Sequence, residues 1–420
     1  YHHVAEADVD YLLHLGDFIY ESANGNYLGP EDSIPDGRNF ELPSNKPLAE
    51  TLADFRFLYK TYRSDSLMQS ALERHTLIAG WDDHEIGNNR YWDYAAGAPV
   101  LPDKADGDDA EFALELTANG IQAWVEHMPA RVEYDPSTTD LHDQFTLYRT
   151  LEFGDLVDLV VTDERLFRDG PACPTEDRVS CGNEDARDRT MLGKKQKEWW
   201  KEQVSLSAAT WTVWVNEVLT MPLTLGEDWY QVEFLQDSWD GFQAERYELM
   251  QHVDGADRQN FVTLTGDLHA SLAGYMKSHY GEVGSGDSDR VGVEFMTPAI
   301  SSLTADSVID FSTPWNSEGL NDLATTENGH LQYMDWYRNG YAVVTFDEEA
   351  CRYTAYEVDT ETDSAEADRS KLAEFRVPNG DIELQQQYNA FEENVGSDWD
   401  DGWGDDWGDE FGGDWLDGWF

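Results

Sequence analysis

The 420-residue chain is poor in basic side chains, with 28 lysines and arginines against 85 aspartates and glutamates. The resulting net charge of -57 repels phosphate backbones, which excludes nucleic-acid binding by bulk electrostatic attraction. The acidic residues are spread along the chain rather than confined to one tail. A high-salt environment tolerates such a surface, because salt screens its self-repulsion. We therefore expect a halophilic or marine origin, with an ordinary acidic protein as the alternative.

Long apolar runs are also missing, and without a run of about 18 apolar residues we expect no transmembrane helix. Only three cysteines occur. Cys173 and Cys181 share one polar loop, where their spacing favours a local disulfide over a zinc site or two free thiols. A disulfide favours export to the periplasm, the cell surface or the medium. No signal peptide is visible, and because the chain begins at Tyr1 without Met we expect it to be truncated or processed.

Apolar strands alternate with amphipathic helices over the first 270 residues or so. Strands are expected within residues 8–17, 75–84, 151–167, 211–221 and 260–271, and helices within 48–72, 109–128, 193–207 and 241–254. This alternation predicts a layered α/β fold. After about residue 290 the pattern is strand-rich, and we expect residues 291–302, 340–347 and 351–360 to complete a second sheet.

Four of these strands end in side chains that bind metals or move protons. They are Asp17 with Tyr20, Asp83 with His84, Asn216, and Asp267 with His269. In open α/β sheets, functional residues collect at the carboxyl ends of strands. Most of these donors are hard oxygen atoms, which suit Fe³⁺, Ca²⁺, Mn²⁺ or Mg²⁺ better than structural zinc. A carboxylate that bridges two ions gives the geometry used for phosphate-ester hydrolysis.

Six blocks, in this order, carry a resemblance to a known family: "HLGDFIYE", "GWDDHEIGNN", "EHMPAR", "RTMLGKKQKEWW", "DSWDGFQAER" and "LTGDLHAS". They resemble the PhoD-like alkaline phosphatases and phosphodiesterases, which belong to the calcineurin-like metallophosphoesterases. The match covers roughly residues 1–360. It implies a layered β-sandwich flanked by helices, whose strand ends converge on a dinuclear metal site.

The resemblance also implies metal ligands. Asp17 matches the carboxylate that bridges both metal positions, and Tyr20 and His269 match ligands of a ferric ion. Asp83 and Asp267 then face the second metal. Asn216 is assigned to the ligands as well, with the neighbouring Glu217 as the alternative. The implied cofactors are Fe³⁺ and Ca²⁺.

His84 matches the phosphate-facing histidine of the wider superfamily, so we expect it to donate a hydrogen bond or proton during catalysis. Asp82 is expected to support the turn or to lie behind the ligands. Arg165, beside Asp163, is expected to clamp the substrate phosphate with its planar fork, with a structural ion pair as the alternative. The implied activity is hydrolysis of phosphate mono- or diesters by a metal-bound hydroxide.

Two other functions stay open: a non-catalytic, exported Ca²⁺-binding surface protein of the same fold, and a phospholipase-D-like phosphodiesterase. The family pattern also has a cysteine iron ligand and a small β domain before the first block. None of the three cysteines holds that position. We therefore expect the catalytic domain of this chain to lack its first strand and that small domain.

We divide the chain into a catalytic domain, residues 1–376, and a tail, residues 377–420. No lysine or arginine follows Arg376, and aromatic residues recur every fourth position from Trp399 to Trp419. Six interspersed glycines oppose a helix there, so we expect a disordered acidic tail. The alternative is a segment that orders on binding Ca²⁺, a membrane or a partner.

Overall fold

The computed structural model describes residues 1–23, 40–173, 182–225, 232–233, 236–256, 258–280, 289–304, 317–360 and 365–391. Its centre is a seven-stranded mixed sheet in the order β15-β13-β14-β12-β9-β8-β7. The strands are β7 (Arg149–Phe153), β8 (Val157–Val161), β9 (Trp211–Val215), β12 (Phe261–Thr265), β13 (Ser271–Lys277), β14 (Arg290–Met296) and β15 (Leu331–Asp335). Strands β8, β9, β12 and β14 are parallel, so their carboxyl ends share one edge.

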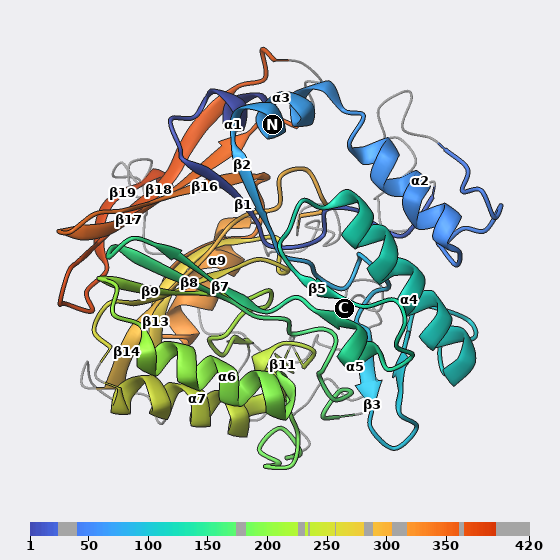
Figure 1. Cartoon of the computed structure of the whole chain (residues 1–420). Coiled ribbons are helices and arrows are strands. Elements are labelled where there is room, and N and C mark those ends of the chain that lie inside the picture. The colour runs from blue at the N-terminus through green and yellow to red at the C-terminus, as the bar shows by residue number, and fades with distance from the viewer. Residues whose placement is uncertain are drawn as a thin grey trace, which may run out of the picture.

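A second, antiparallel sheet lies against one face of the large sheet (Figure 1). Its strands are β16 (Gly340–Phe346), β17 (Ala350–Val358), β18 (Arg369–Pro378) and β19 (Gln385–Asn389). Val213 and Val262 of the large sheet share one buried apolar cluster with Phe375 of the small sheet. The rings of Phe295 and Tyr353 stack across the interface with centroids 4.6 Å apart. The two sheets therefore form a sandwich.

Helices α6 (Gly193–Leu206) and α7 (Gln243–Gly255) cover the opposite face of the large sheet (Figure 1). Trp200 of α6 and Leu249 of α7 pack with Trp214 of β9, and the two tryptophan rings lie 4.9 Å apart. Every residue of β9 is buried, because both faces of the strand are covered. This explains its continuous apolar run, which is typical of central parallel strands.

A further lobe carries the first two strands. Strands β1 (Tyr11–His14) and β2 (Thr76–Ala79) pair in parallel, and α2 (Leu52–Tyr62), α3 (Ser66–Arg74) and α4 (Ala110–His127) accompany them. The single helix expected over residues 48–72 is wrong, because Asp65 accepts the backbone N–H groups of Leu67 and Met68 and thereby starts α3.

The remaining elements are short and connect these layers. They are α1 (His2–Glu6), β3 (Tyr91–Asp93), β4 (Ala98–Val100), β5 (Glu133–Tyr134), α5 (Leu141–Gln144), β6 (Phe145–Thr146), β10 (Thr224–Leu225), β11 (Val232–Glu233), η2 (Trp239–Phe242) and α9 (Ser317–Glu327).

The strand-rich region divides between the two sheets. Strands β16 and β17 form the second sheet as expected, but β14 lies between β12 and β13 in the large sheet. Six of its seven residues are buried, which suits a strand covered on both faces.

The small sheet extends beyond residue 376, where we expected a domain boundary. Strand β18 continues to Pro378, and β19 pairs with it, with Glu374 opposite Tyr388. The sheet thus takes up the first residues assigned to the tail. Residues 392–420 lie outside the described part of the chain.

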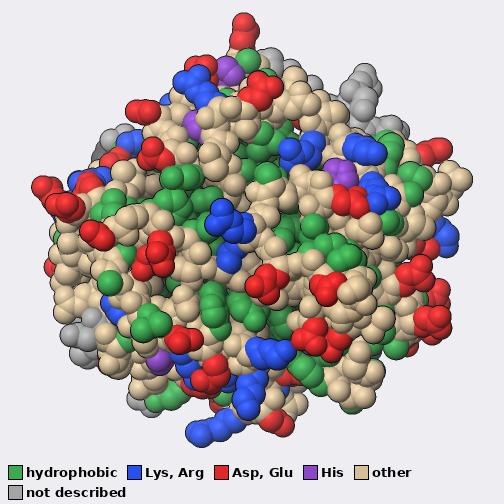
Figure 2. Space-filling model, viewed as in Figure 1, with side chains coloured by type: hydrophobic (Ala, Val, Ile, Leu, Met, Phe, Trp, Pro, Cys, Tyr) green, Lys and Arg blue, Asp and Glu red, His purple; other side chains and the backbone are tan. Residues whose placement is uncertain are grey.

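Cys173 is disulfide-bonded, whereas Cys351 is a buried free thiol. The expected partner, Cys181, lies outside the described residues. In the described part of the chain, no helix is both long and apolar enough to cross a membrane. Figure 2 shows acidic side chains spread across one face of the molecule rather than gathered in a single patch.

Candidate active site

Five strand ends carry polar side chains at one end of the molecule, and those of four strand ends meet in one cluster. Asp17 follows β1, the segment Asp82–His84 follows β2, Arg165 follows β8, Asn216 follows β9, and Asp267 and His269 follow β12. Each is presented by the turn after a strand, as the sequence predicted. Because these strand ends lie together, residues up to about 250 positions apart in the sequence touch one another.

Asp17, Tyr20 and His269 form one side of the cluster. The hydroxyl of Tyr20 lies 2.9 Å from Nε2 of His269 and 3.4 Å from Oδ2 of Asp17. Nδ1 of His269 lies 2.6 Å from the carbonyl oxygen of Leu303. A carbonyl oxygen only accepts, so Nδ1 carries the proton and the Nε2 lone pair points into the site. Among the described residues, none donates a hydrogen bond to the buried Oδ1 of Asp17.

The turns that carry these ligands are strained. The φ angles are 53° at Asp17, 65° at Asp267 and 55° at His269, all in the left-handed region that non-glycine residues rarely adopt. Each costs on the order of 1 kcal/mol or more and persists only where the surrounding structure imposes it. Gly16 is required before Asp17, because a Cβ there would lie 2.4 Å from the Cβ of Asp82. Such strain is typical of functional sites.

Arg165 lies opposite this group and is fully buried among carboxylates. Its Nε donates to Asp82, its Nη2 donates to Asp267, and its Nη1 lies 3.5 Å from Asp83 and 3.2 Å from Asp237. Burial raises the pKa of Asp83, but the charges of Arg165 and His84 outweigh it and hold that pKa below its usual value. At Asp267 burial dominates and raises the pKa.

His84 stands between these two groups. Its Nδ1 lies 2.7 Å from Oε2 of Glu21, and its ring stacks on that of Tyr20 with centroids 4.2 Å apart. Burial raises the pKa of Glu21, but attraction to His84 and Lys104 lowers it to about 2, so Glu21 is anionic. Burial lowers the pKa of His84, but Glu21, Asp83 and Asp17 together raise it well above its usual value. These carboxylates therefore favour the imidazolium form of His84.

Three acidic residues of the site are not among those predicted from the sequence: Glu21, Glu85 and Asp237. Glu85 is completely buried and accepts the backbone N–H groups of Asp17, Phe18 and Asp82 at 3.1, 2.7 and 2.7 Å. Glu21 and Glu85 directly follow Tyr20 and His84 in the quoted blocks. An acid at the end of an apolar strand and turn was the signal that could have identified both.

Asn216 lies at the same sheet edge, but its amide is engaged with neighbouring groups. Its Nδ2 donates to Val218 and to Oγ1 of Thr220, and its Oδ1 accepts from Nε1 of Trp239 at 3.2 Å. The neighbouring Glu217 accepts the backbone N–H of Glu164 at 2.7 Å. The structure thus shows Asn216 anchoring the turn after β9 to the indole of Trp239.

Two groups of side chains have the spacing to hold a metal ion. One comprises Asp17, Asp83 and His84, the other Asp82, Asp83 and Asp267, and in each the ligand atoms lie within 4.8 Å of one another. Asp83 is common to both, whereas the resemblance assigns the bridge to Asp17. The carboxylates fit hard cations such as Ca²⁺ and Fe³⁺. A dinuclear centre stays a prediction.

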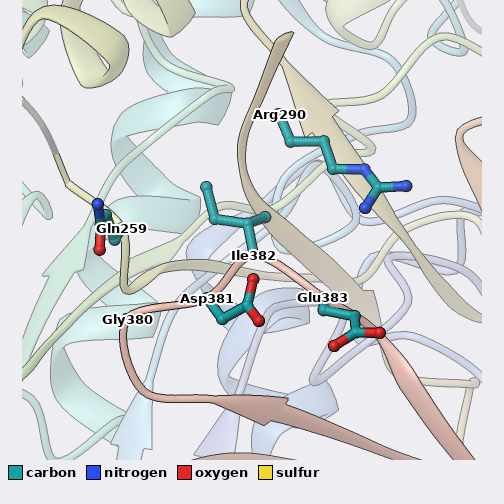
Figure 3. A pocket seen from close by; sticks show the side chains of 6 residues that line it. All are labelled: Gln259, Arg290, Gly380, Asp381, Ile382 and Glu383. Carbon is teal, nitrogen blue, oxygen red and sulfur yellow. The ribbon is translucent and has the colours of Figure 1, made fainter. Parts of the chain in front are cut away.

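A cavity of about 420 Å³ lies away from this cluster. It is lined by Gln259, Arg290, Gly380, Asp381, Ile382 and Glu383. Figure 3 shows the Asp381 and Glu383 side chains on the connection between β18 and β19, with Arg290 at the start of β14 in the large sheet. Because Gln259 and Arg290 lie at the amino ends of β12 and β14, the cavity is at the opposite edge of the sheet from the site.

The sandwich and the adjoining pair β1 and β2 bring carboxylates, a phenol and imidazoles together at the carboxyl ends of parallel strands. This arrangement defines an α/β protein with an acidic site. Residues 1–355 match the family described as PhoD-like phosphatase, and the chain belongs to that family. Over 347 residues it is 30% identical to alkaline phosphatase D of Bacillus subtilis (strain 168), covering 82% of this chain and 54% of that protein.

A solved structure described as "Structure of PhoD" matches with a TM-score of 0.76 and 26% identity, covering 92% of this chain and 68% of that one. The chain thus spans about half the length of the Bacillus enzyme. The family predicted from the sequence blocks is confirmed.

Proposed function

We propose that the chain hydrolyses phosphate esters, as an alkaline phosphatase or phosphodiesterase, with metal held at the strand ends. One observation carries this: Asp17, Tyr20 and His269 converge, and Oδ1 of Asp17 is buried with no hydrogen-bond donor among the described residues. An unmet buried acceptor of this kind costs about 1–3 kcal/mol or more, which a cation would offset. Membership of the PhoD-like phosphatase family supports a phosphate ester as substrate.

Asp17, the Tyr20 hydroxyl and Nε2 of His269 are the proposed ligands of Fe³⁺. Asp83 and Asp267 are proposed to face Ca²⁺. Asn216 would join them only by releasing its bonds to Val218, Thr220 and Trp239. Burial and the nearby Asp17 raise the pKa of Tyr20, so the phenol on its own is neutral. When bound, the cations supply positive charge for the phosphoryl oxygens and acidify the attacking water.

His84 is proposed as the donor to the phosphate or the leaving group. The anionic Glu21 holds its Nδ1 proton, and Tyr20 stacks on its ring, so the imidazole has one fixed orientation. Fixed donors in a buried site stabilise developing charge without reorganising. Arg165 lies in the same cluster, and as a phosphate clamp it would have to exchange carboxylate partners for phosphate oxygens.

Hydrolysis of p-nitrophenyl phosphate and bis(p-nitrophenyl) phosphate, with the full chain loaded with Fe³⁺ and Ca²⁺, tests this function. We expect turnover that a chelator removes and that Asp17→Ala and His269→Ala abolish. His127→Gln is the control, because His127 bonds its own helix at Ala123. Turnover that survives Asp17→Ala contradicts the proposal. Ca²⁺ binding without turnover would favour the non-catalytic alternative.

We also propose that the protein is exported, which the disulfide of Cys173 supports. Thiol titration of the denatured, unreduced protein should then find one reactive cysteine, Cys351. Three reactive thiols in protein from its natural source would contradict export.

A further inference from the structure

The guanidinium of Arg165 lies where Ca²⁺ is expected at the second metal position. Asp82, Asp83 and Asp267 have the spacing of a metal site, and each of the three is ion-paired with Arg165. The Arg165 side chain is completely buried, and the Asp82 and Asp83 side chains are at most 4% exposed. One positive side chain therefore engages every carboxylate of the group.

The four carboxylates around Arg165, those of Asp82, Asp83, Asp237 and Asp267, form an acidic cage in which the charges do not balance. Arg165 contacts four carboxylates, Arg168 lies 3.6 Å from Asp237, and the charge of His84 lowers the pKa of Asp83. Buried carboxylates repel one another unless cations lie between them. The four carboxylates still outnumber these cations, so a cation of higher charge than a guanidinium would be attracted to them.

We propose that Arg165 is a tethered cation that competes with Ca²⁺, the ion of the second metal position, for the oxygens of Asp82, Asp83 and Asp267. Both need the same carboxylate oxygens, and two cations a few ångströms apart repel each other strongly at a buried position. The divalent ion therefore binds only when the guanidinium leaves the cage. This inference rests on the proposed metal-dependent function, since it names the residue that sets the affinity of its second metal position.

Calorimetric titration of Ca²⁺ into the metal-free full chain, at constant ionic strength, tests the competition. Arg165→Met keeps the length of the side chain and removes its charge. We expect it to tighten one Ca²⁺ site by roughly tenfold or more. Arg165→Lys, with a compact charge and fewer contacts, should give an intermediate gain. The control is Arg168→Met, which removes a neighbouring buried charge outside the three-carboxylate group and should change the affinity much less.

A double variant locates the site. If Ca²⁺ replaces the guanidinium, Arg165→Met with Asp267→Asn should lose most of the gain, because one of the shared carboxylates is gone. A gain that survives Asp267→Asn, or one that Arg168→Met reproduces in full, overturns the proposal. Equal Ca²⁺ affinities of the wild type and Arg165→Met would also overturn the proposal.

The melting temperature gives a second readout that needs no substrate. Without metal, Arg165→Met should melt below the wild type, because its carboxylates are unopposed, and Ca²⁺ should raise its melting temperature more than that of the wild type. If Arg165→Met does not fold, the same comparison with Arg165→Lys decides the matter. Absent hydrolysis in the wild type would refute the proposed function and leave this competition measurable.

Discussion

The carboxylate of Glu85 accepts the backbone N–H of Phe18 at 2.7 Å, and this bond ties the turn after β1 to the turn after β2. The same side chain accepts the backbone N–H groups of Asp17 and Asp82. Glu85 is not a proposed metal ligand, but this one buried acid links the two turns that carry most of the proposed ligands.

Replacing Glu85 should therefore loosen both turns together. Glu85→Ala leaves three buried donors without an acceptor, and we expect a loss of about 3 kcal/mol of unfolding free energy. Metal affinity should fall by roughly tenfold or more, since the ligand-bearing turns lose their support. Urea denaturation and metal titration measure the two effects. The exposed Glu133→Ala is the control, and equal stability of both variants would contradict the assignment.

The bond between Glu21 and His84 predicts a selective loss of catalysis. Glu21→Gln keeps a hydrogen-bond acceptor but removes the charge that orients the imidazole and holds its proton. We expect kcat to fall roughly tenfold to a hundredfold with little change in KM. The loss should be larger for an alkyl phosphate than for p-nitrophenyl phosphate, because the poorer leaving group needs a proton. Equal losses of kcat on both substrates would indicate a merely structural role for Glu21. The control is Glu6→Gln, a substitution at an exposed position.

His330 predicts a pH dependence of stability that is separate from the site. Its Nε2 lies 2.8 Å from the carbonyl oxygen of Pro222, and burial, with Arg246 and Lys277 nearby, lowers its pKa to about 4. In the unfolded chain the imidazole of His330 takes up a proton near pH 6.5, whereas in the folded chain it does so only near pH 4. Stability is thus complete above pH 6.5 and falls between pH 6.5 and 4, by at most about 3 kcal/mol.

His330→Gln should reduce that fall, because glutamine does not titrate and still donates to Pro222. Urea denaturation of both proteins at pH 7.5, 6 and 5 measures the difference, so that carboxylates common to both cancel. Parallel pH profiles for the two proteins would rule out His330 as a source of the pH dependence.

The net charge of -57 predicts a salt-dependent stability. Raising NaCl from about 0.1 to 2 M shortens the screening length to a few ångströms and weakens the repulsion among acidic side chains. We expect the melting temperature to rise by roughly 5 °C or more. Sucrose at equal osmolarity is the control for general exclusion effects. A melting temperature that follows sucrose and not salt would contradict a halophilic character.

Much of the site was predictable from local sequence because strand ends carry their own signal. An apolar run followed by Gly-Asp or Asp-Asp-His marks a turn at a sheet edge, and the structure brings Asp17, Tyr20, Asp83, His84, Asp267 and His269 together there. Glu21 and Glu85 stood in the same blocks. Their position marked them as candidates, but their roles depend on long-range partners that no local pattern shows: the imidazole of His84 for Glu21, and the backbone N–H groups of Asp17, Phe18 and Asp82 for Glu85.

Local pattern by itself determined where most of the strands and helices lie and which turns carry polar chemistry, since periodicity and turn residues act within a few positions. It did not separate α2 from α3 or β7 from β8. Only the tertiary structure decided that β14 joins the large sheet, that the amide of Asn216 meets Trp239, and that Arg165 lies against Asp267, 102 residues away. The physical reason is that strand order and the pairing of buried charges depend on contacts between segments far apart in the sequence. From its local sequence alone, Arg165 at the end of a strand is compatible both with a phosphate clamp and with an acidic cage.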